Sequence, residues 1–196
     1  MTDKETTELI YQVLRSKYYE PGWGNGRNWV TIREARVGTG YTGLNKRSFD
    51  FLAISTKNGN DVIGHEVKAS RADFLADLKD PEKQKALRCY STEFYYVAPK
   101  DVVRKEELPP WAGLMELIYR DHDKDYYLST TVLSPRLHPF APTWGFVAAC
   151  IRNRTEPQVR ELSQENEELR QELHVLKEEI GHIRLNRLLL RKKEGV

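Results

Sequence analysis

Hydrophobic positions recur at two different spacings in the first 155 residues, so this part of the chain is expected to contain both helices and strands. Alternating or continuous apolar runs predict strands at residues 30–37, 49–54, 62–68, 93–98, 114–119 and 126–133. Helical spacing and turn residues predict helices over residues 3–18, over 70–79, in a short stretch ending near Cys89, and over 143–154. Strands bracketed by helices indicate an α/β domain.

The pattern changes near residue 155, and we expect a boundary at about 154–158 between a domain over 1–155 and a tail over 156–196. No proline or aromatic residue follows Pro157. Two interleaved series with a seven-residue period then occupy the a and d positions of a coiled coil. The predicted dimer contacts are Val159, Leu162, Asn166, Leu169, Leu173, Leu176, Ile180, Ile183 and Leu190.

The charged residues that flank the a and d positions, which form the seam of the predicted coiled coil, favour two parallel helices. Acidic residues occupy the g positions Glu165, Glu172 and Glu179, and basic residues occupy the e positions Arg170, Lys177 and Arg184. In a parallel pair each acid meets a base of the partner, and Asn166 at an a position favours an in-register homodimer. An amphipathic helix folded back on its own domain is the alternative. A basic-zipper DNA reader is excluded, because CIRNRTEPQ precedes the repeat instead of a basic helix.

Composition restricts the class of protein without naming its partner. The 196 residues are 39% hydrophobic and 31% charged, with a net charge of +2, which allows a folded core and excludes a polycationic coat protein. No apolar run approaches the length of a membrane span, and the first ten residues lack the apolar core of a signal peptide. Cys89 and Cys150 are too few for a disulfide framework or a four-cysteine zinc site. These features predict a soluble, cytoplasmic protein with no membrane partner.

Three charged residues interrupt two apolar strands and are the candidates for a catalytic site. Asp50 lies in FDFLAI, and Glu66 and Lys68 lie two apart in VIGHEVK, on one side of that strand. If the strands pair across the KNGND turn, Asp50 comes close to the other two. Mg²⁺ is often held by one or two carboxylates with waters and phosphate oxygens, so the three residues suit phosphodiester hydrolysis. A structural ion pair explains them equally well at this point.

The stretch from Val30 to Leu114 resembles the MmcB-like branch of the PD-(D/E)XK nuclease superfamily, which occurs in bacterial and phage proteins. The matching segments are REARVGTGY, FDFLAIS, GHEVKASRADFLADLKDPEK, EFYYVAP and ELPPWAGLMEL. The resemblance implies a restriction-endonuclease-like mixed sheet flanked by helices, here followed by the long C-terminal coiled-coil helix that the family pattern lacks. It also implies that Asp50, Glu66 and the Val67 carbonyl hold Mg²⁺ or Mn²⁺, and that Lys68 is the catalytic lysine.

Other residues are candidates for the same site. Glu34 or Glu8 could supply a third acidic ligand. Arg71 opposes the dipole at the start of its helix, so we expect it to reach the site or a phosphate. The resemblance adds a second set of DNA-binding candidates on the following helix, where a solvated polar face is an equally good explanation: Lys83, Gln84 and Lys85.

The sequence therefore predicts a metal-dependent DNA endonuclease that acts as a parallel dimer, and the resemblance implies a role in DNA repair or recombination. The first alternative is a catalytically silent nuclease-like protein that grips DNA. The second is an adaptor that works through its coiled coil, with another protein bound along the rod.

Overall fold

A computed structural model describes most of the chain. The described residues are 1–19, 28–37, 48–57, 59–79, 85, 87–122 and 124–193. The chain divides into two compact units, Met1–Arg154 and Thr155–Val196. The nuclease-like character of the first unit and the coiled-coil character of the second remain predictions.

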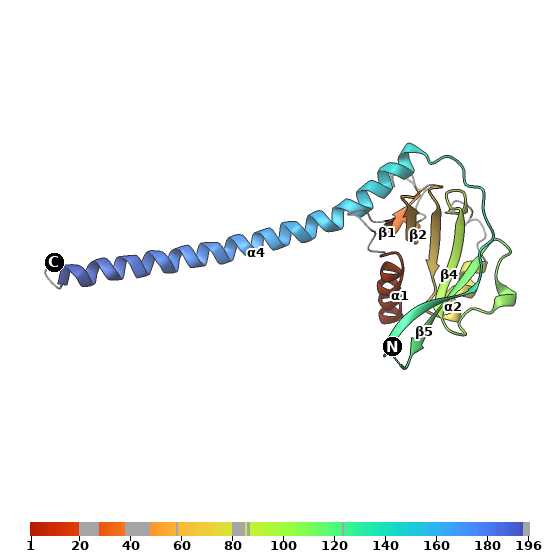
Figure 1. Cartoon of the computed structure of the whole chain (residues 1–196), viewed down its shortest axis with the longest axis horizontal. Helices are drawn as coiled ribbons and strands as arrows, with labels where there is room; N and C mark the ends of the chain where they lie inside the picture. Colours follow the sequence, from red (N-terminus) through yellow and green to blue (C-terminus); the bar gives the residue numbers. More distant parts are fainter. Residues whose placement is uncertain are drawn as a thin grey trace. The chain divides into compact units, whose positions relative to one another are not determined.

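The first unit contains a six-stranded mixed sheet in sequence order, β1-β2-β3-β4-β5-β6. Its strands are β1 (Trp29–Arg36), β2 (Ser48–Ser55), β3 (Val62–Val67), β4 (Glu93–Pro99), β5 (Gly113–Arg120) and β6 (Asp125–Val132). The first three strands are antiparallel, β4 runs parallel to β3 and to β5, and β6 returns antiparallel to β5. The predicted α/β fold is confirmed as a mixed sheet flanked by helices (Figure 1).

Helix α1 (Asp3–Lys17) covers one face of the sheet. Its start is fixed by a capping box, in which the Thr2 side chain accepts from the Glu5 backbone and Glu5 accepts from the Thr2 backbone. Ile10 and Leu14 are fully buried and belong to a hydrophobic cluster with Phe51, among others. The helical spacing seen in the sequence is thus the face that packs on the strands.

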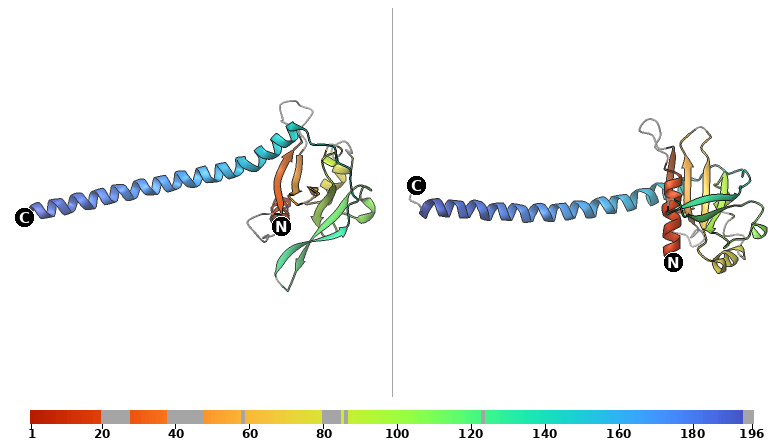
Figure 2. Two further views of the ribbon diagram at one scale, coloured as in Figure 1. Left: turned by 45° about the horizontal axis from the view of Figure 1, so that its top comes forward. Right: turned by 60° about the horizontal axis from the view of Figure 1, so that its bottom comes forward.

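Helix α2 (Arg71–Leu78) contributes to the core on the opposite face of the sheet. Phe74 is fully buried there in a second cluster with Phe94, Tyr96 and Phe146. In β4, successive side chains alternate between the two clusters, because neighbouring residues of a strand point to opposite faces. In the right-hand view of Figure 2, α1 (red) runs alongside the strands.

Two sequence predictions about helices need correction or extension. Hydrophobic spacing in the sequence places Leu75 on the apolar face of α2, but Leu75 is 38% exposed, whereas Asp77 is buried. Helix α4 (Trp144–Lys193) continues without a break through Pro157, where the sequence suggested a link. A proline inside a helix removes one backbone hydrogen bond without necessarily ending the helix. Over the described residues, no helix is both long and apolar enough to cross a membrane.

Candidate functional site

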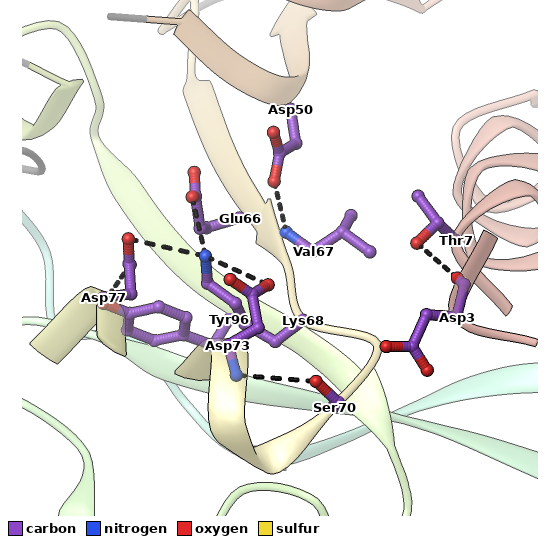
Figure 3. Close-up of polar contacts among 10 residues, drawn as sticks. All are labelled: Asp3, Thr7, Asp50, Glu66, Val67, Lys68, Ser70, Asp73, Asp77 and Tyr96. Carbon is purple, nitrogen blue, oxygen red and sulfur yellow. Dashed lines mark hydrogen bonds and ion pairs between the residues drawn. The ribbon is translucent and has the colours of Figure 1, made fainter. Parts of the chain in front are cut away.

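The β2–β3 pairing brings together the residues singled out from the sequence. Phe51 pairs with His65, so one further step in the same antiparallel register places Asp50 opposite Glu66. The Asp50 Oδ2 atom accepts a hydrogen bond from the Val67 amide at 2.8 Å. Figure 3 shows the Asp50 carboxylate held there, beside the Glu66 side chain.

Lys68 lies at the end of β3 and is almost completely buried among carboxylates. Its Nζ atom lies 3.0 Å from Glu66 Oε1, 3.4 Å from Asp77 Oδ1 and 3.7 Å from Asp73 Oδ2. The side chains of Lys68 and Glu66 are each 3% exposed and that of Asp77 is 1% exposed, whereas Asp73 is 57% exposed. One ammonium group is therefore shared by two buried carboxylates and one at the surface (Figure 3).

The strand next to β3 supplies a neutral member of this cluster. Tyr96 pairs with Glu66 in the β3–β4 register, and its hydroxyl donates to Asp77 Oδ2 at 3.3 Å. Burial raises the pKa of Tyr96 above its ordinary value, and the negative charges of Asp77 and Glu66 raise it further. The hydroxyl thus keeps its proton at neutral pH and can act as a donor.

Local structure explains how α2 presents its two acids to Lys68. Ser70 is the N-cap of the helix and accepts from the Asp73 backbone at 3.4 Å. The buried ring of Phe74 packs edge-on against Tyr96, with 5.2 Å between ring centroids. Because Asp73 and Asp77 are four residues apart, both lie on the side of the helix that faces Lys68.

The two candidates for a third acidic ligand are placed differently. Glu8 forms an ion pair with Arg33, and that hydrogen bond lowers the pKa of Glu8. Glu34 has a positive φ of 53° and a side chain that is 70% exposed. Within the described residues, no group of three or more His, Cys, Asp or Glu side chains could hold a metal ion. A third acidic ligand thus remains a prediction.

The predicted DNA-binding residues are only partly described. Arg71 donates to Glu107 Oε1 at 2.5 Å and to the Val102 carbonyl at 3.3 Å, which ties α2 to the loop after β4. Lys85 is exposed. Lys83 and Gln84 lie outside the described residues. Contact of these four side chains with DNA stays a prediction.

The oxygen donors near the adjoining ends of β2 and β3 fit a hard divalent cation. Asp50 and Glu66 offer carboxylate oxygens from neighbouring strands, and Val67, whose amide donates to Asp50, directly follows Glu66 in the chain. Magnesium commonly takes one or two protein carboxylates and completes its shell with water and substrate oxygens. The chemistry of this donor set therefore suits Mg²⁺ or Mn²⁺ without a third acidic side chain.

The seam proposed for dimerisation lies on α4 in the second unit. The described apolar seam residues are between 49% and 57% exposed in the single chain: Leu162, Leu169, Leu173, Leu176 and Ile180. The Asn166 side chain donates to the Leu162 carbonyl at 2.9 Å. The side chains of Val159, Ile183 and Leu190 lie outside the described ones.

The sequence reasoning missed Asp77 and Tyr96. On a helical wheel Asp77 falls with Asp73 and Asp80 on an acidic face, although it comes three residues after the buried Phe74. That spacing was the available signal. Tyr96 belongs to a continuous apolar strand, where periodicity does not single out one hydroxyl.

Comparison with known proteins adds information about the fold alone. No family model matches the chain, and no curated protein matches it. Among solved structures it is similar to the SPO1766 protein of unknown function from Silicibacter pomeroyi, with a TM-score of 0.50 and 18% sequence identity. The similarity covers 83% of this chain and 90% of that chain. Both chains thus share a mixed α/β architecture.

Proposed function

We propose that the protein is a Mg²⁺- or Mn²⁺-dependent DNA endonuclease with a restriction-endonuclease-like sheet. The single observation that carries this proposal is the buried Lys68–Glu66 pair beside Asp50, at the adjoining ends of two strands. Burying charged groups is costly, and replacing such a pair by apolar residues is often neutral or stabilising. A catalytic role for these charged groups explains why they are buried although the fold does not require it.

In this proposal Asp50, Glu66 and the Val67 carbonyl hold the cation. When bound, the cation neutralises charge on the phosphate and activates a water molecule. The Lys68 ammonium lies beside one of the ligands and donates hydrogen bonds toward the charge that develops on the phosphate oxygens. Arg71 and Lys85 are candidates to contact the DNA backbone, because both are positively charged: Arg71 is the first residue of α2, and Lys85 follows that helix in the chain.

The second part of the proposal is that α4 joins two chains in a parallel dimer. The half-exposed leucines at the a and d positions support it, because pairing would remove their apolar surface from water. Two active sites in one particle suit cleavage of both strands or of a branched DNA. The resemblance implies a role in DNA repair or recombination, and the rod offers a surface for another protein.

A second candidate function is DNA binding without cleavage. It is favoured by the ion pairs that already occupy the Lys68 ammonium. In that case the same fold would grip DNA, and the coiled coil would act as an adaptor.

The two candidates are separated by incubating the purified protein with labelled duplex, flap, junction and single-stranded DNA. Each substrate is tested with Mg²⁺, with Mn²⁺ and with a chelator. The variants Glu66→Gln and Lys68→Met keep the approximate side-chain shape, and Asp121→Asn removes an exposed carboxylate beyond β5 as a control. Thermal unfolding of every variant shows which ones are folded at the assay temperature.

A nuclease cleaves at least one substrate with metal, loses this activity in both site variants and keeps it in the control. The substrate cut fastest then identifies the preferred DNA structure. Binding without cleavage in either metal contradicts the nuclease and supports the second candidate. Cleavage that persists in Glu66→Gln contradicts the assignment of the site.

A further inference from the structure

A buried carboxylate outside the predicted ligand set contacts Lys68 and also accepts a hydrogen bond from a buried hydroxyl. Asp77 on α2 contacts the Lys68 ammonium through Oδ1 at 3.4 Å and accepts from Tyr96 through Oδ2 at 3.3 Å. We propose that Asp77, held in place by Tyr96, is the positioning residue that keeps Lys68 directed at the reacting phosphate. This inference rests on the proposed nuclease function and deepens its account of the site.

The position of Asp77 within α2 indicates that its contacts with specific side chains account for an acid there. It is the seventh of the eight residues Arg71–Leu78, where a negative charge opposes the helix dipole. The capping role at the start of the helix belongs to Ser70. Because an acid at this buried position is unfavourable for the helix and for desolvation, its contacts with Lys68 and Tyr96 are the reason for it.

The two buried carboxylates around Lys68 would have different binding partners when a cation is present. Glu66 is a proposed ligand and would direct its charge to the cation. Asp77 comes from another element; one of its oxygens accepts from Tyr96 and the other contacts the ammonium. Asp77 therefore fixes Lys68 independently of the ligand shell. Asp73 contributes less, because its contact is longer and its carboxylate is exposed to water.

Tyr96 holds Asp77 in a fixed position relative to the sheet. Its backbone is in register with Glu66 in the neighbouring parallel strand, so it belongs to the same rigid sheet as the proposed ligands. Its ring packs edge-on against Phe74, one turn before Asp77 on α2. The hydroxyl thus links the helix to the sheet at the level of Lys68 (Figure 3).

The test compares Asp77→Asn and Tyr96→Phe with wild type and with Asp73→Asn. Steady-state cleavage is measured on the best substrate of the DNA panel, in Mg²⁺. Misplacing a reacting group by about 1 Å can cost about 100-fold in rate, so we expect Asp77→Asn to lower kcat by about 10- to 100-fold. KM and the affinity for Mn²⁺ should stay within about twofold, since the groups that bind DNA and metal are kept. Asp73→Asn should reduce kcat less than Asp77→Asn.

A second readout follows Lys68 itself, by NMR of full-length protein labelled with ¹⁵N at the lysine side-chain nitrogens. The Lys68 signal is assigned by its loss in Lys68→Met. We expect both Asp77→Asn and Tyr96→Phe to shift this signal, while Asp73→Asn leaves it close to its wild-type position. Tyr96→Phe removes a single oxygen atom and keeps the test usable if Asp77→Asn does not fold.

Failure of this inference can be told apart from failure of the proposed function. If the wild type cleaves no DNA, the nuclease proposal is wrong, and the NMR signal still decides whether Asp77 positions Lys68. If the wild type cleaves DNA and Asp77→Asn keeps its kcat within twofold, Asp77 is not a positioning residue. An unshifted Lys68 signal in both Asp77→Asn and Tyr96→Phe overturns the inference in either case.

Discussion

The ammonium nitrogen of Lys68 lies 3.0 Å from Glu66 Oε1, and each of the two side chains is 3% exposed. A buried pair of this kind is weak support for stability, because the desolvation cost is comparable to the attraction between the charges. Removing one partner alone is different, since it leaves the other charge buried without compensation. The stability of variants at this site therefore reports how the charges are shared.

The first prediction is that Lys68→Met is more destabilising than Glu66→Gln. Methionine leaves Glu66 and Asp77 both buried without their cation, and we expect a loss of about 3 kcal/mol in the free energy of unfolding. Glutamine at position 66 leaves Lys68 in contact with Asp77, so its cost should be smaller. Urea unfolding at neutral pH measures both. A Lys68→Met variant as stable as wild type would show that the carboxylates are compensated in another way.

The second prediction concerns His65, which lies on the face of β3 opposite the site. The ring is fully buried; the Tyr18 hydroxyl lies 2.9 Å from Nε2 and the Phe51 carbonyl lies 3.2 Å from Nδ1. Tyr18 donates to Nε2 when Nδ1 carries the proton that binds Phe51. Burial lowers the pKa of His65 to about 3.

The sign of the resulting pH dependence follows from this lowered pKa. Between about pH 6.5 and pH 3 the unfolded chain binds a proton that the folded protein excludes, so stability falls as the pH decreases through this range. We expect His65 to contribute a slope near 1.4 kcal/mol per pH unit to the free energy of unfolding between pH 6 and 5. Urea unfolding of His65→Gln at the same pH values should show a flatter profile. Equal slopes in the two proteins would contradict a neutral buried His65.

The neighbourhood of Asp50 and Glu66 was predictable because it depends on a local hairpin. The KNGND turn between two short apolar runs fixes the register, and the register fixes which residues face each other. The same reasoning correctly placed all six strands to within a few residues. By contrast, the contact between Asp77 and Tyr96 joins a helix to a strand that is paired in parallel, and no local pattern specifies how such elements dock.

The third prediction is that Gly64→Ala is destabilising for a steric reason. A methyl group at this position of β3 would lie 2.5 Å from the Phe49 ring and 2.9 Å from Ser91 Oγ. Because Phe49 is fully buried, its ring has little room to move, and we expect a cost of about 1–3 kcal/mol by denaturant unfolding.

A double-mutant cycle identifies the contact responsible. In a Phe49→Leu background, which shortens the obstructing side chain, Gly64→Ala should cost less than in wild type by about 1 kcal/mol. If the cost is the same in both backgrounds, the clash with Phe49 is not its cause.

The fourth prediction addresses the tail. The full chain should sediment as a dimer, and Leu169→Asp should raise the dimer dissociation constant at least about 100-fold, because a charge at the seam is left desolvated. Asn166→Cys, in a background without Cys89 and Cys150, should form a disulfide-linked dimer on oxidation. Position 166 meets its own copy only in a parallel pair. A monomeric wild type would favour the helix folded back on its domain, and a dimer that does not cross-link would contradict the parallel arrangement.

The features that periodicity could not reveal are those that depend on which side of a helix is buried. Phe74, Leu75 and Leu78 predict one face of α2 by hydrophobicity, yet the buried face contains Phe74 and Asp77 while Leu75 is partly exposed. On that buried side Asp77 contacts Lys68 and Tyr96. A buried polar residue such as Asp77 therefore resembles, in the sequence, part of a solvated helix face.

The central claim is that Asp50 and Glu66 hold a divalent cation, and titration of the protein with Mn²⁺ tests it most directly. Electron paramagnetic resonance measures free Mn²⁺, with wild type compared with Asp50→Asn, Glu66→Gln and the Asp121→Asn control. We predict one Mn²⁺ bound per chain in wild type and control, with affinity lowered at least about tenfold in the two site variants. Wild-type protein that binds no Mn²⁺, or that keeps its affinity when either carboxylate is replaced, would contradict the account.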